Sequence, residues 1–167
     1  FVNKLQLLQT YKIVYIFDDS GSMNASLLES PLNNNNNLVK ATRWDELKYF
    51  ASISIEIASI FNSNGCDIYF LNRFPSPVKN ILDSSQLVNY FRDKPAGLTP
   101  ISRVLNQVLT DNPPQVLGER NLLIILATDG EPTNQQGQVD TNEFKNILIS
   151  RPNCVFTNIV CCTDDDD

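Results

Sequence analysis

The 167-residue chain contains no histidine. Ser-His-Asp and Cys-His catalysis, general-base chemistry by imidazole and the usual zinc sites all depend on this residue. Its absence excludes those classes of site. A serine or cysteine in this chain therefore lacks its usual catalytic partner.

Long apolar runs and clustered basic residues are also missing. No apolar run approaches the roughly 20 residues that span a bilayer, and the opening "FVNKLQLLQTYK" lacks the pattern of a signal peptide. The 13 Lys and Arg are scattered and are outnumbered by 19 Asp and Glu, which gives a formal net charge of −6. We therefore expect a soluble protein with no membrane span and no nucleic-acid partner.

Cysteine is present but shows no metal-binding pattern. The four residues Cys66, Cys154, Cys161 and Cys162 lack CxxC spacing, and three of them lie in or beside apolar strand-like runs. Cysteine in such runs behaves as a small hydrophobic residue, so we expect buried free thiols.

The pattern of apolar residues predicts a single α/β domain over residues 1–167. Near-continuous apolar runs predict strands at 12–17, 66–72, 121–128 and 154–162. The two prolines of "RFPSPVKNI", residues 73–81, allow at most an edge strand or hairpin in that stretch. Apolar residues at helical spacing predict helices at about 44–62, around 87–91, after Pro100 and after Asp140. Strands that alternate with helices predict a doubly wound, mostly parallel central sheet with helices on both faces.

Local signals place the helix starts and one insertion. Candidate N-caps are Thr42 with Asp45, Asp83 or Ser84, Thr99 before Pro100, and Asp140 with Glu143. Residues 23–41 include Pro31 and five consecutive asparagines without periodicity. We interpret this stretch as an Asn-rich inserted surface loop that adds nothing to the core.

Oxygen-bearing side chains gather where two predicted strands end and one predicted helix starts. Parallel strands present their carboxyl ends at one edge of the sheet, so these side chains are expected to meet there. A hard cation such as Mg²⁺ prefers octahedral oxygen ligands, and Gly21 lets the first loop curl so that its serines share one space. The candidate metal ligands are Asp18, Ser20, Ser22, Thr99 and Asp129.

The three segments "DDSGS", "GLTP" and "TDG" together resemble the von Willebrand factor type A domain, also called the integrin inserted domain, with its metal-ion-dependent adhesion site. The likeness covers roughly residues 10–162. It implies a Rossmann-like fold in which Ser20 and Ser22 bind Mg²⁺ directly, with Mn²⁺ or Ca²⁺ as alternatives. Thr99, Asp18 and Asp129 would bind directly or through water.

The same resemblance implies a partner. In the family, a Glu or Asp carboxylate from another protein takes the open sixth position of the metal. Asp19 has no ligand role in the family pattern, so we expect it to be solvated or to lie behind the ligands.

The chain also departs from the family. One further strand or helix normally follows the strand expected at 154–162, whereas this sequence ends in "TDDDD", which would suit the start of that helix. We expect a truncated C-terminus that lacks the last helix. The 23–41 loop is longer than the family pattern predicts and would lie beside the metal.

Three functions fit these observations. The first is a non-enzymatic module that docks a partner's acidic group through Mg²⁺. The second is a metal-dependent enzyme of phosphoryl transfer or hydrolysis, although the chain has no GxxxxGK[ST] loop and no histidine base. The third is a metal-free scaffold of the same fold. The cysteine pattern favours an intracellular family member over an extracellular one.

Overall fold

The computed structural model describes residues 6–33 and 40–163. The centre of the Asn-rich stretch and the terminal aspartates at 164–167 lie outside the described residues. The expected helix start at the C-terminus therefore stays a prediction. The expectation that residues 23–41 add nothing to the core was wrong at the described start of this stretch, because Met23 and Leu27 are buried and Met23 packs in the core with Trp44.

A five-stranded, mostly parallel sheet forms the centre of the molecule. Its order is β3-β2-β1-β4-β5, and β3 is the antiparallel member at one edge. The strands are β1 (Tyr11–Phe17), β2 (Cys66–Phe70), β3 (Val78–Ile81), β4 (Asn121–Thr128) and β5 (Val155–Cys161). The α/β class, the four parallel strands and the edge strand after "RFPSP" are thus confirmed.

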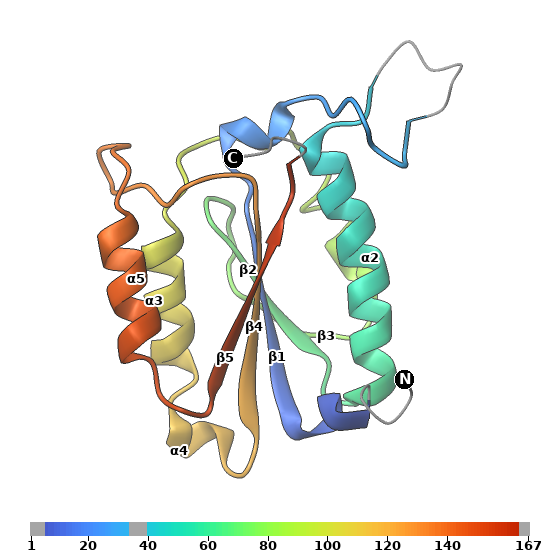
Figure 1. Cartoon of the computed structure of the whole chain (residues 1–167). Helices are drawn as coiled ribbons and strands as arrows, with labels where there is room; N and C mark the ends of the chain where they lie inside the picture. The colour runs from blue at the N-terminus through green and yellow to red at the C-terminus, as the bar shows by residue number, and fades with distance from the viewer. Residues whose placement is uncertain (1–5, 34–39, 164–167) are drawn as a thin grey trace.

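Helices pack on both sides of the sheet. Figure 1 shows α2 (Arg43–Phe61) on one side and α3 (Ile101–Asp111) with α5 (Thr141–Ser150) on the other. Alternate residues of β1 face these two layers: Tyr15 and Phe17 join the core under α2, whereas Val14 and Ile16 join the core under α3 and α5. A strand buried on both faces needs apolar residues at every position, which explains the unbroken "IVYIF".

Two local expectations were wrong, and one short helix was missed. Only a single 3-10 turn, η3 (Ser84–Leu87), follows the Asp83 cap, because Leu87 is buried but Val88 is exposed and offers no continuous apolar face. Helix α3 begins at Ile101 with Pro100 as its N-cap residue, so Thr99 precedes the cap and its side chain does not cap the helix. The short helix α4 (Pro114–Leu117) was not expected.

The cysteines are only partly buried. All four are free; Cys66 and Cys162 are buried, Cys154 is half-buried and Cys161 is exposed. Burial was wrongly expected for Cys161, because β5 is an edge strand and most of its side chains are exposed. Within residues 6–33 and 40–163, no helix is long and apolar enough to cross a membrane.

Candidate metal centre at the carboxyl edge of the sheet

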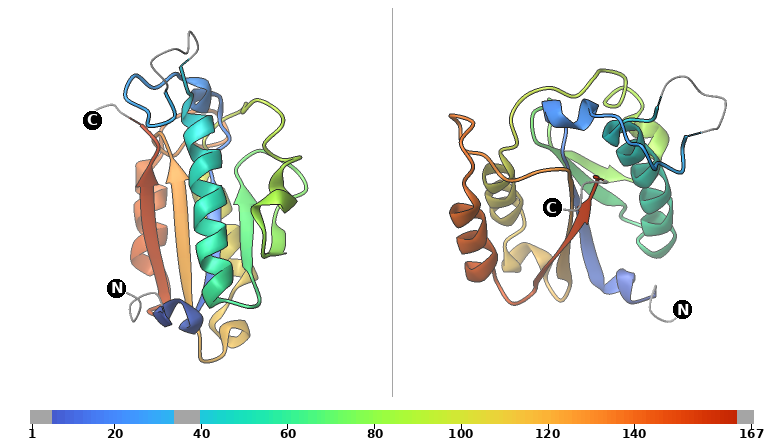
Figure 2. Two further views of the ribbon diagram at one scale, coloured as in Figure 1. Left: turned by 90° about the vertical axis from the view of Figure 1, so that its right-hand side faces the viewer. Right: turned by 45° about the horizontal axis from the view of Figure 1, so that its top comes forward.

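The pairing of β1 with β4 places the two candidate carboxylates side by side. Phe17 lies opposite Ala127, and the Asp18 N–H donates to the Ala127 carbonyl at 3.0 Å. Asp18 and Asp129 therefore leave adjacent parallel strands at the same end, as expected for a site in this class of sheet. The tilted view in Figure 2 brings this end forward, with the short helix η2 (Gly21–Asn24) lying across it.

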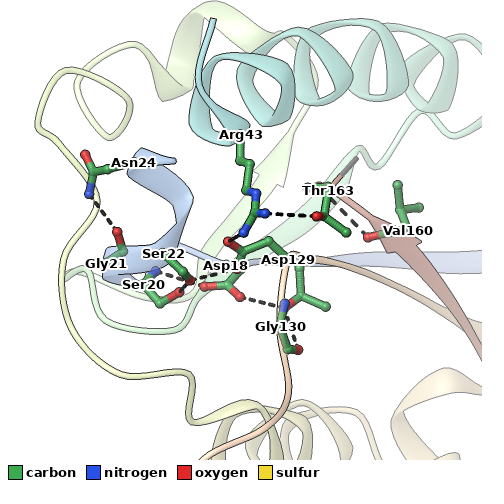
Figure 3. Close-up of polar contacts among 12 residues, drawn as sticks. Asp18, Ser20, Gly21, Ser22, Asn24, Arg43, Asp129, Gly130, Val160 and Thr163 are labelled. Atoms are coloured by element: carbon green, nitrogen blue, oxygen red, sulfur yellow. Dashed lines mark hydrogen bonds and ion pairs between the residues drawn. The ribbon is translucent and has the colours of Figure 1, made fainter. Parts of the chain in front are cut away.

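The serines connect the two strand ends. Ser20 Oγ lies 3.0 Å from Ser22 Oγ, and the Ser22 hydroxyl donates to Asp129 Oδ1 at 2.9 Å. Figure 3 shows these side chains pointing toward one another from the β1 loop and the end of β4. The loop curls at Gly21, whose N–H donates to the Gly97 carbonyl at 3.1 Å.

Asp18 is a buried carboxylate with two hydrogen-bond donors. Oδ1 accepts from the Ser20 N–H at 2.8 Å, and Oδ2 accepts from the Thr128 hydroxyl at 2.6 Å. Burial raises the pKa of Asp18 above its usual value; the hydrogen bonds from Ser20 and Thr128 oppose this rise, and the negative charge of Asp129 adds to it. A cation at this position would offset the unfavourable charge.

Asp129 already has a cationic partner. Arg43 Nη1 donates to Asp129 Oδ2 at 2.9 Å, and its Nη2 donates to the Thr163 hydroxyl at 3.0 Å (Figure 3). The Asp129 side chain is 0% exposed and that of Arg43 is 13% exposed. Sequence reasoning missed Arg43; its position at the first turn of α2 was visible, but the pairing spans 86 residues and no local pattern reveals it.

Thr99 takes no part in the hydrogen bonds of the cluster. It is buried, and its backbone is tied to Thr133: the Thr99 N–H donates to Thr133 Oγ1 at 3.0 Å, and the Thr133 N–H donates to the Thr99 carbonyl at 2.9 Å. In the described part of the chain, no hydrogen bond joins the Thr99 hydroxyl to the other four candidates. The described hydrogen bonds therefore connect Asp18, Ser20, Ser22 and Asp129 and do not include Thr99.

Asp19 turns the opposite way from Asp18. It is 1% exposed; Oδ1 accepts from the Asn72 N–H at 2.8 Å, and Oδ2 lies 3.1 Å from Arg73 Nε. The Arg73 guanidinium in turn stacks on Trp44, with its carbon 4.6 Å from the ring centre. The expectation of a solvated Asp19 was wrong, whereas a position behind the ligands agrees with these contacts.

All of the candidate metal ligands bind through oxygen atoms. Within residues 6–33 and 40–163, no group of three or more His, Cys, Asp or Glu side chains is placed to hold a metal ion. The candidate set instead combines two carboxylates with the hydroxyls of Ser20 and Ser22. An all-oxygen set of this kind fits a hard cation that keeps several waters, such as Mg²⁺, and does not fit a softer metal that needs nitrogen or sulfur.

Comparison with known proteins identifies no family. No protein-family model matches the chain, and no curated protein matches it either.

Proposed function

We propose that the chain is a non-enzymatic protein-binding module, a doubly wound domain of the von Willebrand factor A type, that docks an acidic group of a partner through Mg²⁺. The observation that carries this proposal is the continuous set of oxygen donors at the sheet edge, from Asp18 through Ser20 and Ser22 to Asp129. Mn²⁺ or Ca²⁺ could take the same place.

The residues of the cluster would have separate roles. Ser20 and Ser22 offer neutral hydroxyl oxygens, and Asp18 and Asp129 supply the two negative charges that balance a dication. Thr99 follows closely after Gly97, whose carbonyl accepts from the Gly21 N–H between the two serines, so Thr99 would bind the ion through water. A bound Mg²⁺ would supply the positive centre that attracts a partner's carboxylate. Ser22 is exposed, so the cluster is reachable from solvent.

Mg²⁺ should stabilise the folded chain through this cluster. A ligand that binds only the native state raises the free energy of unfolding by RT ln(1 + [L]/Kd), so millimolar Mg²⁺ is expected to raise the melting temperature. Asp129→Asn and Asp18→Asn should abolish the rise, because each removes a charge that the cation needs. Asp140→Asn is the matched control: it keeps a residue that caps α5 well and should leave the rise unchanged.

A crystal tests the docking step separately. Crystals soaked in Mn²⁺ and acetate should show an anomalous peak between Ser20, Ser22 and Asp129, with an acetate oxygen among the ligands. A peak whose ligands all come from the chain and from water would contradict docking of a carboxylate. The absence of any peak would favour the metal-free scaffold.

The metal-free scaffold is the second candidate, and one observation favours it. Arg43 already neutralises Asp129 at 2.9 Å, so the cluster has a charge partner from its own chain. The enzymatic alternative has no comparable observation in its favour among residues 6–33 and 40–163. The melting and soaking experiments separate the first two.

A further inference from the structure

We infer that Arg43 competes with the metal ion for Asp129 and thereby sets the affinity of the cluster for cations. This inference rests on the proposed function, because it assigns a regulator to the same metal site. The guanidinium of Arg43 would then lower the affinity of the domain for cations.

The backbone of Arg43 is held in place. The residue begins α2, where Thr42 and Asp45 form a capping box, and its N–H donates to the Ala25 carbonyl at 3.0 Å. The side chain is therefore directed over the end of β4 from a fixed helix start. Figure 3 shows it reaching from the helix to Asp129.

The carboxylate of Asp129 is divided between two neighbours. Oδ1 accepts from the Ser22 hydroxyl at 2.9 Å and Oδ2 accepts from Arg43 at 2.9 Å. A cation beside the serines would use the carboxylate that Arg43 also uses. The buried guanidinium and a dication would then share one acidic group and repel each other across a few ångströms.

A second contact restrains the guanidinium. Nη2 donates to Thr163 at the end of β5, at 3.0 Å, so Arg43 links the start of α2 to the ends of β4 and β5. Moving Arg43 away from Asp129 would require this hydrogen bond to break or to rearrange. Thr163 should therefore strengthen the competition without carrying charge.

Titration with MgCl₂ alone, by isothermal calorimetry at constant ionic strength, tests the inference. Arg43→Gln should bind Mg²⁺ about tenfold more tightly than the natural chain, since a repulsion of about 1.4 kcal/mol corresponds to a factor of ten. Arg43→Lys keeps the charge and should stay within about threefold of the natural affinity. Thr163→Val should bind about two- to threefold more tightly.

The matched control is Arg120→Gln. It removes the same charge just before β4, at the opposite end of that strand, roughly 30 Å from Asp129 by strand length. Its Mg²⁺ affinity should be unchanged, which separates local competition from a change in net charge. If Arg43→Gln does not fold, Thr163→Val and Arg43→Lys still decide the question.

Each outcome bears on a different claim. Unchanged or weaker Mg²⁺ binding by Arg43→Gln, or by Thr163→Val where the first does not fold, would overturn the competition and leave the metal site standing. A tenfold gain in Arg43→Lys would also overturn it, because the charge would then not be the cause. If none of the proteins binds Mg²⁺, both the inference and the proposed function fail.

Discussion

The neighbouring residues Asp18 and Asp19 lie in one loop but make different contacts. Asp18 faces the hydroxyl cluster and carries no cationic partner in the described contacts, whereas Asp19 is paired with Arg73 on the other side of the loop. Both have a pKa raised by burial, against hydrogen bonds that lower it. Unlike Asp19, Asp18 has a second carboxylate beside it, that of Asp129, whose negative charge adds to the rise of its pKa.

Replacing Asp18 by asparagine should stabilise the metal-free chain at neutral pH. Burial raises the folded-state pKa of Asp18 above the unfolded value of 3.8, so the neutral carboxyl is favoured in the folded chain. The free energy of unfolding is therefore highest below pH 3.8, and it falls as the pH rises through the folded-state pKa of Asp18. Asparagine never ionises and avoids this loss. In EDTA, urea unfolding should show a higher free energy of unfolding for Asp18→Asn than for the natural chain at pH 7.

The pH series provides the check on this prediction. The difference between the two proteins should shrink as pH falls toward 4, because the natural side chain then becomes neutral in the folded state. Asp19 is present in both proteins, so its own titration cancels. A difference that stays constant from pH 4 to pH 7, or that has the opposite sign, would contradict the burial argument.

Among the elements, α2 has the most direct influence on the cluster. Its capping box fixes the helix start from which Arg43 reaches Asp129, and Trp44 and Leu47 anchor the same turn in the core. The Thr42 side chain accepts from the Asp45 N–H at 3.2 Å. Losing this cap should therefore weaken both the helix and the position of Arg43.

Thr42→Ala should lower the free energy of unfolding by about 1 kcal/mol, the usual effect of losing an N-cap. Urea unfolding measures it. Ser59→Ala in the same helix is the control, since its exposed hydroxyl donates to the Glu56 carbonyl within the helix and its loss should change stability by less than about 0.5 kcal/mol. Equal effects of the two changes would show that the capping box has no special weight.

Strands that are covered on both faces could be predicted from the sequence, and so could helices whose capping residues are close in the sequence. The run "NLLIILAT" matches β4 residue for residue because a strand covered on both sides is apolar throughout, and Asp140 caps α5 as its spacing indicated. The end of β4 then places Asp129 beside Asp18 through simple parallel register. These parts of the fold and of the site follow from short-range chemistry.

Other features depend on contacts that no short segment contains. Asp19 is buried because Asn72 and Arg73, beyond the end of β2, close over it. Arg43 meets Asp129 only after α2 has packed across the sheet. Thr99 resembled an N-cap in sequence, but its backbone pairs with Thr133 and the helix starts two residues later.

At the scale of the whole molecule, the loops at the carboxyl edge support one another. The Ala96 N–H donates to the Asp19 carbonyl at 2.8 Å, the Asn24 amide donates to the Pro95 carbonyl at 2.8 Å, and the Asn72 amide donates to the Leu98 carbonyl at 2.9 Å. These contacts join the loops after β1 and β2 to the segment before α3. We therefore expect the positions of Ser20 and Ser22 to depend on this set of contacts.

Gly97 contacts both of the other loops, through the Gly21 N–H and the Asn72 side chain, so Gly97→Ala should disturb them all. Its φ of +109° disfavours a side chain, and a Cβ there would lie 2.7 Å from Asn72 Cγ, the side chain that holds both Asp19 and Leu98. Gly118→Ala is the matched control. Gly118 also has a positive φ, +64°, but a Cβ there would meet nothing within 4 Å, and it lies before the opposite end of β4.

Urea unfolding and Mg²⁺ titration of the two variants separate local strain from loop support. Gly118→Ala should lose about 1 kcal/mol through its backbone alone and bind Mg²⁺ as the natural chain does. Gly97→Ala should lose about 2–4 kcal/mol, because Asn72 must move, and its Mg²⁺ affinity should fall at least about fivefold as Ser20 and Ser22 shift with Gly21. Equal losses of stability with equal Mg²⁺ affinity would mean that the metal cluster is built by β1 and β4 alone.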